Sequence, residues 1–114
     1  MTDYTSINAF LCENTDAKRS DIVNNSYSVN GLSIEKLRDI LIKIGDISIE
    51  DKENNTYIAV IPGGFLKKNY SSVAIELSNN ELVVAAFSNE GIINQHTTDG
   101  VIDEIERSIS EYLS

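Results

Sequence analysis

Residues 73–87 read VAIELSNNELVVAAF, a pattern that predicts an antiparallel β-hairpin. Apolar side chains alternate with small or polar ones as far as Leu77, and Asn79-Asn80 is a pair that suits a tight two-residue turn. Such a turn places three apolar pairs on one face of the hairpin, namely Leu77 with Leu82, Ile75 with Val84, and Val73 with Ala86. Because a slip of one residue would separate all three pairs, this register is strongly specified.

The opposite face of the same hairpin is more apolar than a solvated sheet face normally is, because it carries Val83, Ala85 and Phe87 beside Glu76. Either another part of the chain or another molecule must cover such a face. These three apolar residues are therefore a candidate contact face for a homodimer or a larger homo-oligomer.

A helix is expected upstream, from Ser33 to residue 44. Ser33 is a typical N-cap residue, and Leu32 and Leu37 have the spacing of a hydrophobic staple. Gly45 is expected to end the helix in the left-handed conformation. The apolar stripe of this helix comprises Ile34, Leu37, Ile40, Leu41 and Ile44.

A second helix is expected to begin at Thr97 or Thr98 and to run to the C-terminal end of the sequence. Acidic residues crowd its first turns, where they are favourable beside the positive end of the helix dipole. Its apolar stripe comprises Val101, Ile102, Ile105, Ile109, Tyr112 and Leu113.

A first hairpin is expected between the two helices, in residues 46–61. Polar and apolar residues alternate over 46–50, Asn54-Asn55 suits a tight turn, and 56–61 is rich in β-branched and aromatic residues. A two-residue loop at the asparagines predicts that Ile49 lies opposite Val60. The following Pro62-Gly63-Gly64 is expected to end the strand.

These elements predict an α+β fold in which an antiparallel sheet of about four strands, formed by two consecutive hairpins, carries two helices packed on one face. The length of 114 residues suits a single domain, with a two-layer core over residues 32–114. Residues 1–31 are expected to form an N-terminal arm or short irregular elements. Within them, Ser6 could cap a short helix, and residues 22–29 could form a small hairpin or an extended arm.

The charge balance of the chain is strongly acidic, with a net charge of -9 and a pI near 4.4. This balance argues against nucleic acid or an anionic membrane as the main partner. The sequence has neither the charged and apolar pattern of a secretory signal nor an apolar run long enough to span a bilayer, so a cytoplasmic location is expected.

Reactive residues are few. Cys12 and His96 are the single cysteine and the single histidine, and a catalytic pair of them would lack an orienting group. Cys12 follows two apolar residues and is expected to fill space in a core, whereas His96 is expected to be exposed or to cap a helix. Residues 51–62 resemble a calcium loop only superficially, because they lack its glycine and its final glutamate. We therefore predict no catalytic site, no metal and no cofactor.

One loop concentrates positive charge on this acidic chain. Gly63 and Gly64 are followed by Lys67 and Lys68, and glycine amides beside lysines are a candidate contact for a small anion. The spacing matches neither the Walker pattern nor the dinucleotide fingerprint. A flexible connection between the hairpins, with solvated lysines, explains the same residues.

The function that this pattern favours is a non-enzymatic acidic protein-binding module of the inhibitor or immunity type, which neutralises or escorts a basic partner protein. Acidic surfaces attract basic proteins and raise their association rates. The alternative is a homo-oligomeric structural or small-ligand-binding domain that uses the apolar face of the second hairpin. The candidate partner-binding residues lie on the last helix and are Asp99, Asp103, Glu104 and Glu106.

Overall fold

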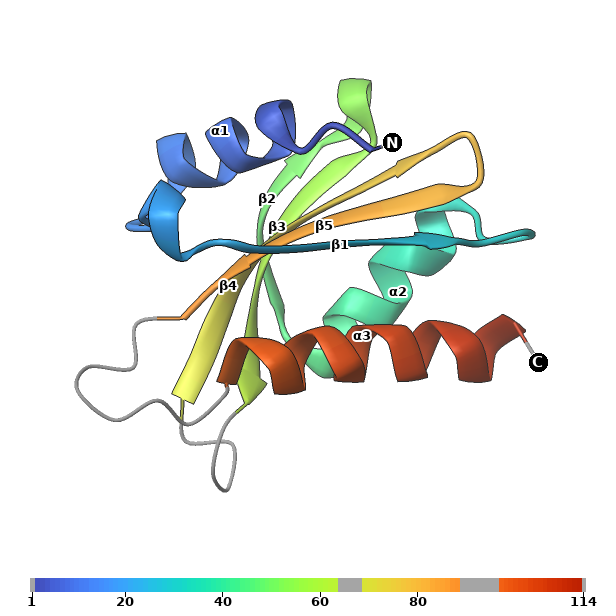
Figure 1. Cartoon of the computed structure of the whole chain (residues 1–114). Coiled ribbons are helices and arrows are strands. Elements are labelled where there is room, and N and C mark those ends of the chain that lie inside the picture. The colour runs from blue at the N-terminus through green and yellow to red at the C-terminus, as the bar shows by residue number, and fades with distance from the viewer. Residues whose placement is uncertain (1, 64–68, 89–96, 114) are drawn as a thin grey trace.

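A five-stranded antiparallel sheet forms the centre of the molecule, with helices on both of its faces (Figure 1). The computed structural model describes residues 2–63, 69–88 and 97–113. The strand order is β1-β5-β4-β3-β2, so the predicted α+β class is confirmed, with five strands and three α-helices. The elements are α1 (Thr5–Asn14), the 3-10 turn η1 (Arg19–Asp21), β1 (Val23–Ser28), α2 (Ile34–Ile44), β2 (Asp46–Asp51), the 3-10 turn η2 (Lys52–Asn54), β3 (Thr56–Gly63), β4 (Asn69–Ser78), β5 (Glu81–Phe87) and α3 (Thr97–Leu113).

The hairpin of β4 and β5 has the predicted register. Asn79 and Asn80 have φ angles of 51° and 62°, the left-handed conformation that a tight hairpin turn requires. The three predicted apolar pairs are all present in the sheet, and they are Leu77 with Leu82, Ile75 with Val84, and Val73 with Ala86.

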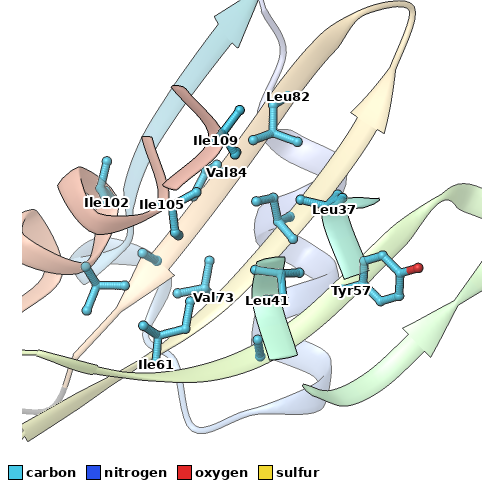
Figure 2. Close-up of a cluster of buried hydrophobic side chains, with 14 of the residues drawn as sticks. Leu37, Leu41, Tyr57, Ile61, Val73, Leu82, Val84, Ile102, Ile105 and Ile109 are labelled. Carbon is cyan, nitrogen blue, oxygen red and sulfur yellow. The ribbon is translucent and has the colours of Figure 1, made fainter. Parts of the chain in front are cut away.

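The main core lies between the sheet and the two helices α2 and α3, as predicted. Leu37 and Leu41 of α2 and Ile105 of α3 are fully buried against the side chains of Val73 and Val84 (Figure 2). The apolar stripes of both helices therefore share one face of the sheet, and this shared core fixes how α3 lies across the strands.

The other face of the sheet is covered by α1, which lies on the side opposite α2 and α3 (Figure 1). Ile7 and Leu11 of α1 pack there against Val83, Ala85 and Phe87 of β5. These three strand residues are at most 8% exposed. The expectation that they form an open contact face for a second copy is therefore wrong, because the N-terminal helix of the same chain occupies that face.

The N-terminal segment is joined to the sheet by β1, which pairs with β5 from Val23 opposite Ala86 to Ser28 opposite Glu81. The side-chain amides of Asn8 in α1 and Asn24 in β1 exchange hydrogen bonds of 3.1 and 2.7 Å. α1 begins at Thr5, whose N–H donates to Asp3 Oδ1, so Ser6 lies inside the helix and does not cap it. The expected arm is thus a helix and an edge strand.

The hairpin of β2 and β3 has a different register from the predicted one. Asp51 lies opposite Thr56, so η2 and Asn55 form a longer loop than a two-residue turn. Ile49 consequently lies opposite Ile58, and its predicted pairing with Val60 is wrong. A bulge between Ile47 and Ile49 shifts the pairing again.

The start of α2 is as predicted, and its end is not. Ser33 Oγ accepts a hydrogen bond of 3.2 Å from the N–H of Lys36, which confirms the N-cap. Gly45 is extended, with a φ of -167°, so the expected left-handed stop is wrong. A Cβ atom at Gly45 would lie 2.5 Å from the carbonyl oxygen of Val60. Glycine is needed here because β3 passes so close to the end of the helix.

Candidate functional site

The acidic residues of α3 separate into two groups on the surface of the helix. Asp99, Asp103 and Glu106 follow one another at spacings of four and three residues, which places them along one flank of the helix, and all three are exposed. We call these three residues the acidic row. Glu104 lies on another side of the helix and is half-buried. The structure therefore brings together three of the four predicted partner-binding residues.

Glu104 is held by a neighbouring cation. Arg107 donates from Nη2 to Glu104 Oε2, and from Nη1 to Glu111 Oε1 at 2.7 Å. Each of these pairs is exposed to solvent on the arginine side, so it contributes little to stability. The arginine charge offsets the negative charge on this side of α3, so the acidic row is the more negative flank of the helix.

Two members of the acidic row, Asp103 and Glu106, lie close enough to Tyr27 of β1 to affect its ionisation. Burial, together with the nearby carboxylates of Glu106 and Asp103, raises the pKa of Tyr27 to about 12. The side chain of nearby Asn25 acts in the opposite direction and lowers the pKa of Tyr27. The buried Tyr27 hydroxyl makes no hydrogen bond within the described residues. A hollow of about 120 Å³ between β1 and α3 is lined by residues that include Tyr27, Glu106 and Ser110.

The raised pKa of Tyr27 predicts an alkaline loss of stability. The folded protein binds this proton more tightly than the unfolded chain, whose tyrosine pKa is near 10.0. The stabilisation is therefore complete below about pH 10 and is lost as the pH rises towards 12. In urea titrations at pH ~9 and ~11.5, Tyr27→Phe should lose less unfolding free energy between the two pH values than the wild type.

Tyr70→Phe is the matched control for that experiment, because Tyr70 is 61% exposed. This variant should keep the pH dependence of the wild type. If Tyr27→Phe lost stability as steeply as the wild type and Tyr70→Phe, the assignment of this titration to Tyr27 would be wrong.

The predicted anion contact is described only at Gly63. This glycine ends β3 opposite Asn69 and is buried. A Cβ atom there would lie 2.7 Å from Val101 Cγ2 and 3.2 Å from the carbonyl oxygen of Thr97. Gly63 thus allows the first turn of α3 to pack closely on the sheet. Gly64, Lys67 and Lys68 lie outside the described residues.

Of the two reactive residues singled out in the sequence, Cys12 and His96, the structure describes the cysteine. Cys12 lies on α1 and is half-buried, whereas His96 falls outside the described residues. Within residues 2–63, 69–88 and 97–113, no three cysteine, histidine or acidic side chains are grouped as a metal site would need. The same residues contain no helix that is both long and apolar enough to cross a membrane.

A cluster of hydroxyl groups joins the start of α3 to the ends of the central strands, and the sequence carries no signal for it. Thr98 Oγ1 donates to Ser88 Oγ at 2.7 Å, and the Ser88 hydroxyl also contacts that of Ser71. Ser71 is fully buried. These residues come from different parts of the fold, and their hydroxyl groups help to position the helix that carries the acidic row.

No protein-family model matches this chain, and a comparison with curated proteins finds no relative.

Proposed function

We propose that this chain is a non-enzymatic, cytoplasmic protein-binding module of the inhibitor or immunity type, and that it binds a basic partner protein through the acidic row. The observation that carries the proposal is the exposure of Asp103 and Glu106 side by side on α3, in a chain with a net charge of -9. Carboxylates so placed attract a basic surface and guide its approach. They lie on the solvent side of a helix whose apolar stripe is buried, so binding need not disturb the core.

The homo-oligomeric alternative relied on an open apolar face of the second hairpin. Val83, Ala85 and Phe87 are covered by α1, and nothing else in the described residues favours a second copy over a basic protein. Two copies of a chain with this net charge also repel each other, whereas a basic partner is attracted.

Reversing the charge of the acidic row tests the proposal. The partner is first captured from extracts of the cells that make the protein, identified by mass spectrometry and purified. Asp103→Lys combined with Glu106→Lys should then lower the association rate roughly tenfold at low salt, and much less at high salt, because exposed charges act mainly on encounter. The dissociation rate should change little. Stopped-flow mixing at several salt concentrations measures both rates.

Glu13→Lys combined with Asp16→Lys is the matched control. Both residues are exposed, and they lie at and just beyond the end of α1, on the opposite side of the sheet. The control makes the same change in net charge, so it separates the position of the acidic row from the overall charge. Equal rates for the two double variants, or a captured partner that is not basic, would refute the proposal.

A further inference from the structure

The two outer edges of the sheet differ in how they are protected. β2 has a bulge between Ile47 and Ile49 and carries acidic residues at 46, 50 and 51, both of which discourage the addition of another strand. β1 reads VNNSYS, with no charge and no proline, and it pairs with β5 without a break over all its residues. β1 also crosses in front of the other strands in Figure 1, at the edge of the sheet.

Two hydrogen bonds identify the backbone groups that point outward from β1. The N–H of Val29 donates to the carbonyl oxygen of Asn80 at 2.7 Å, so this residue is turned towards the β4–β5 hairpin. The N–H of Ser26, three residues earlier, donates instead to the side-chain oxygen of Asn25 at 2.8 Å. Since backbone direction alternates along an antiparallel strand, Asn24, Ser26 and Ser28 present their N–H and C=O groups to the outside. We call this row of groups the β1 edge.

We infer that the β1 edge binds an extended segment of the basic partner as an additional strand of the sheet. This inference rests on the proposed function and specifies how the partner is held. Backbone groups of the added strand would pair with those of Asn24, Ser26 and Ser28, as in other cases of strand addition. The N–H of Ser26 now donates to the side chain of the adjacent Asn25. A carbonyl group of the partner strand could take the place of this local acceptor without breaking the pairing of β1 with β5.

The surroundings of the β1 edge select a segment of defined chemistry. On the α3 side of β1 lies Tyr27, which lines a hollow together with Glu106, so side chains of the added strand on this side approach the acidic row. On the α1 side, the side chain of Asn24 is hydrogen-bonded to that of Asn8, and the Ser26 hydroxyl accepts a 3.3 Å hydrogen bond from the Tyr4 hydroxyl. The best-matched segment alternates lysine or arginine with small polar residues.

A second copy of this chain fits the β1 edge poorly. Antiparallel pairing of two β1 strands about a two-fold axis would form one continuous sheet, with both α3 helices on the same side of it. The acidic rows of the two copies would then flank the junction, and like charges would oppose the contact. Charge complementarity therefore favours a basic strand.

The test uses a blocked synthetic peptide of about ten residues in which lysine alternates with threonine. Its control is a peptide of the same composition with all lysines in one block. NMR titration of the full chain should give saturable binding of the alternating peptide, and amide exchange at Asn24, Ser26 and Ser28 should slow at least about tenfold. The block peptide should bind more weakly and should not protect these amides.

Ser26→Pro removes the outward N–H of the edge and keeps the groups that pair with β5, and proline is tolerated at such edge positions. Ser26→Ala is the matched control, because both variants lose the hydroxyl that accepts from Tyr4. The Kd of the alternating peptide should rise at least about tenfold in Ser26→Pro relative to Ser26→Ala. Circular dichroism of the two variants should be alike and establishes that the proline variant is folded.

Several results would overturn the added strand. They are equal affinity for Ser26→Pro and Ser26→Ala, binding of both peptides without amide protection, and no saturable binding at millimolar peptide. A peptide-free dimer that Ser26→Pro dissociates would assign the edge to a second copy instead. The proposed function can fail or stand independently of the added strand. If a purified partner bound both Ser26 variants equally but associated slowly with the Asp103→Lys, Glu106→Lys variant, the binding role of the acidic row would stand and only the added strand would be refuted.

Discussion

Val84→Asp is expected to unfold the protein. Val84 lies on β5, between β1 and β4, and its side chain is fully buried in the core beneath α3 (Figure 2). A carboxylate at this position would have no partner and no water, which costs several kcal/mol. Since the total stability of a domain of this size is about 5–15 kcal/mol, most of it would be lost. Circular dichroism during thermal unfolding should show no cooperative transition.

Ile75→Asp should have the same effect, because Ile75 lies opposite Val84 and is equally buried. Glu76→Ala is the control on the neighbouring position, whose side chain is half-buried on the other face of the sheet, and it should melt close to the wild type. A cooperative transition of Val84→Asp at the wild-type temperature would contradict the assignment of the two faces.

Leu11→Ala is expected to lower the free energy of unfolding by about 2–5 kcal/mol, the range for removing a fully buried leucine side chain. Leu11 is 0% exposed and packs on the sheet face that carries Val83 and Ala85. Loss of this contact weakens the cover of an apolar face, so the variant should also associate with itself. Urea unfolding measures the loss of stability, and sedimentation velocity measures the association.

Glu13→Ala, on the exposed side of the same helix, is the control and should remain as stable and as monodisperse as the wild type. A Leu11→Ala protein with unchanged stability would mean that α1 does not protect the sheet. The two-sided cover of the sheet would then have to be abandoned.

The sequence predicts the hairpin of β4 and β5 completely because turn chemistry and side-chain pattern agree there. Two asparagines adopt left-handed φ angles, and three apolar pairs share the buried face. At the first hairpin the same reasoning fails, because Asn54 joins a 3-10 turn and Asn55 alone is left-handed. An asparagine pair is thus compatible with two loop lengths, and each loop length gives a different register.

The N-terminal elements are predicted only loosely, for a different reason. α1 is short and buries two of its residues, Ile7 and Leu11, and β1 is mostly polar. Such segments have weak local preferences and become ordered through the partners that they meet. The sequence shows that the outer face of β5 needs a cover, but it does not show that residues 5–14 supply it.

The part of the candidate site that lies on α3 can be predicted from the sequence, because the spacing of residues along a helix fixes which of them share a flank. The spacing along α3 places Asp99, Asp103 and Glu106 on one flank, and Arg107 at three residues from Glu104 explains why that glutamate is separate. The position of β1 beside this flank follows from the order of strands in the sheet, which short-range patterns do not determine.

The pairing of β1 with β5 also has a consequence for the order in which the chain folds. Val23 lies opposite Ala86 and Ser28 opposite Glu81, so the members of each pair are separated by about half of the sequence. During synthesis, at about 5–20 residues per second, β1 leaves the ribosome well before β5 has been made. α1 also cannot pack until then, because its contacts with the sheet are mainly on β4 and β5. A nascent chain that stops before Glu81 therefore carries its earliest segment unpaired, and closing this long loop is the step that should limit the rate of folding.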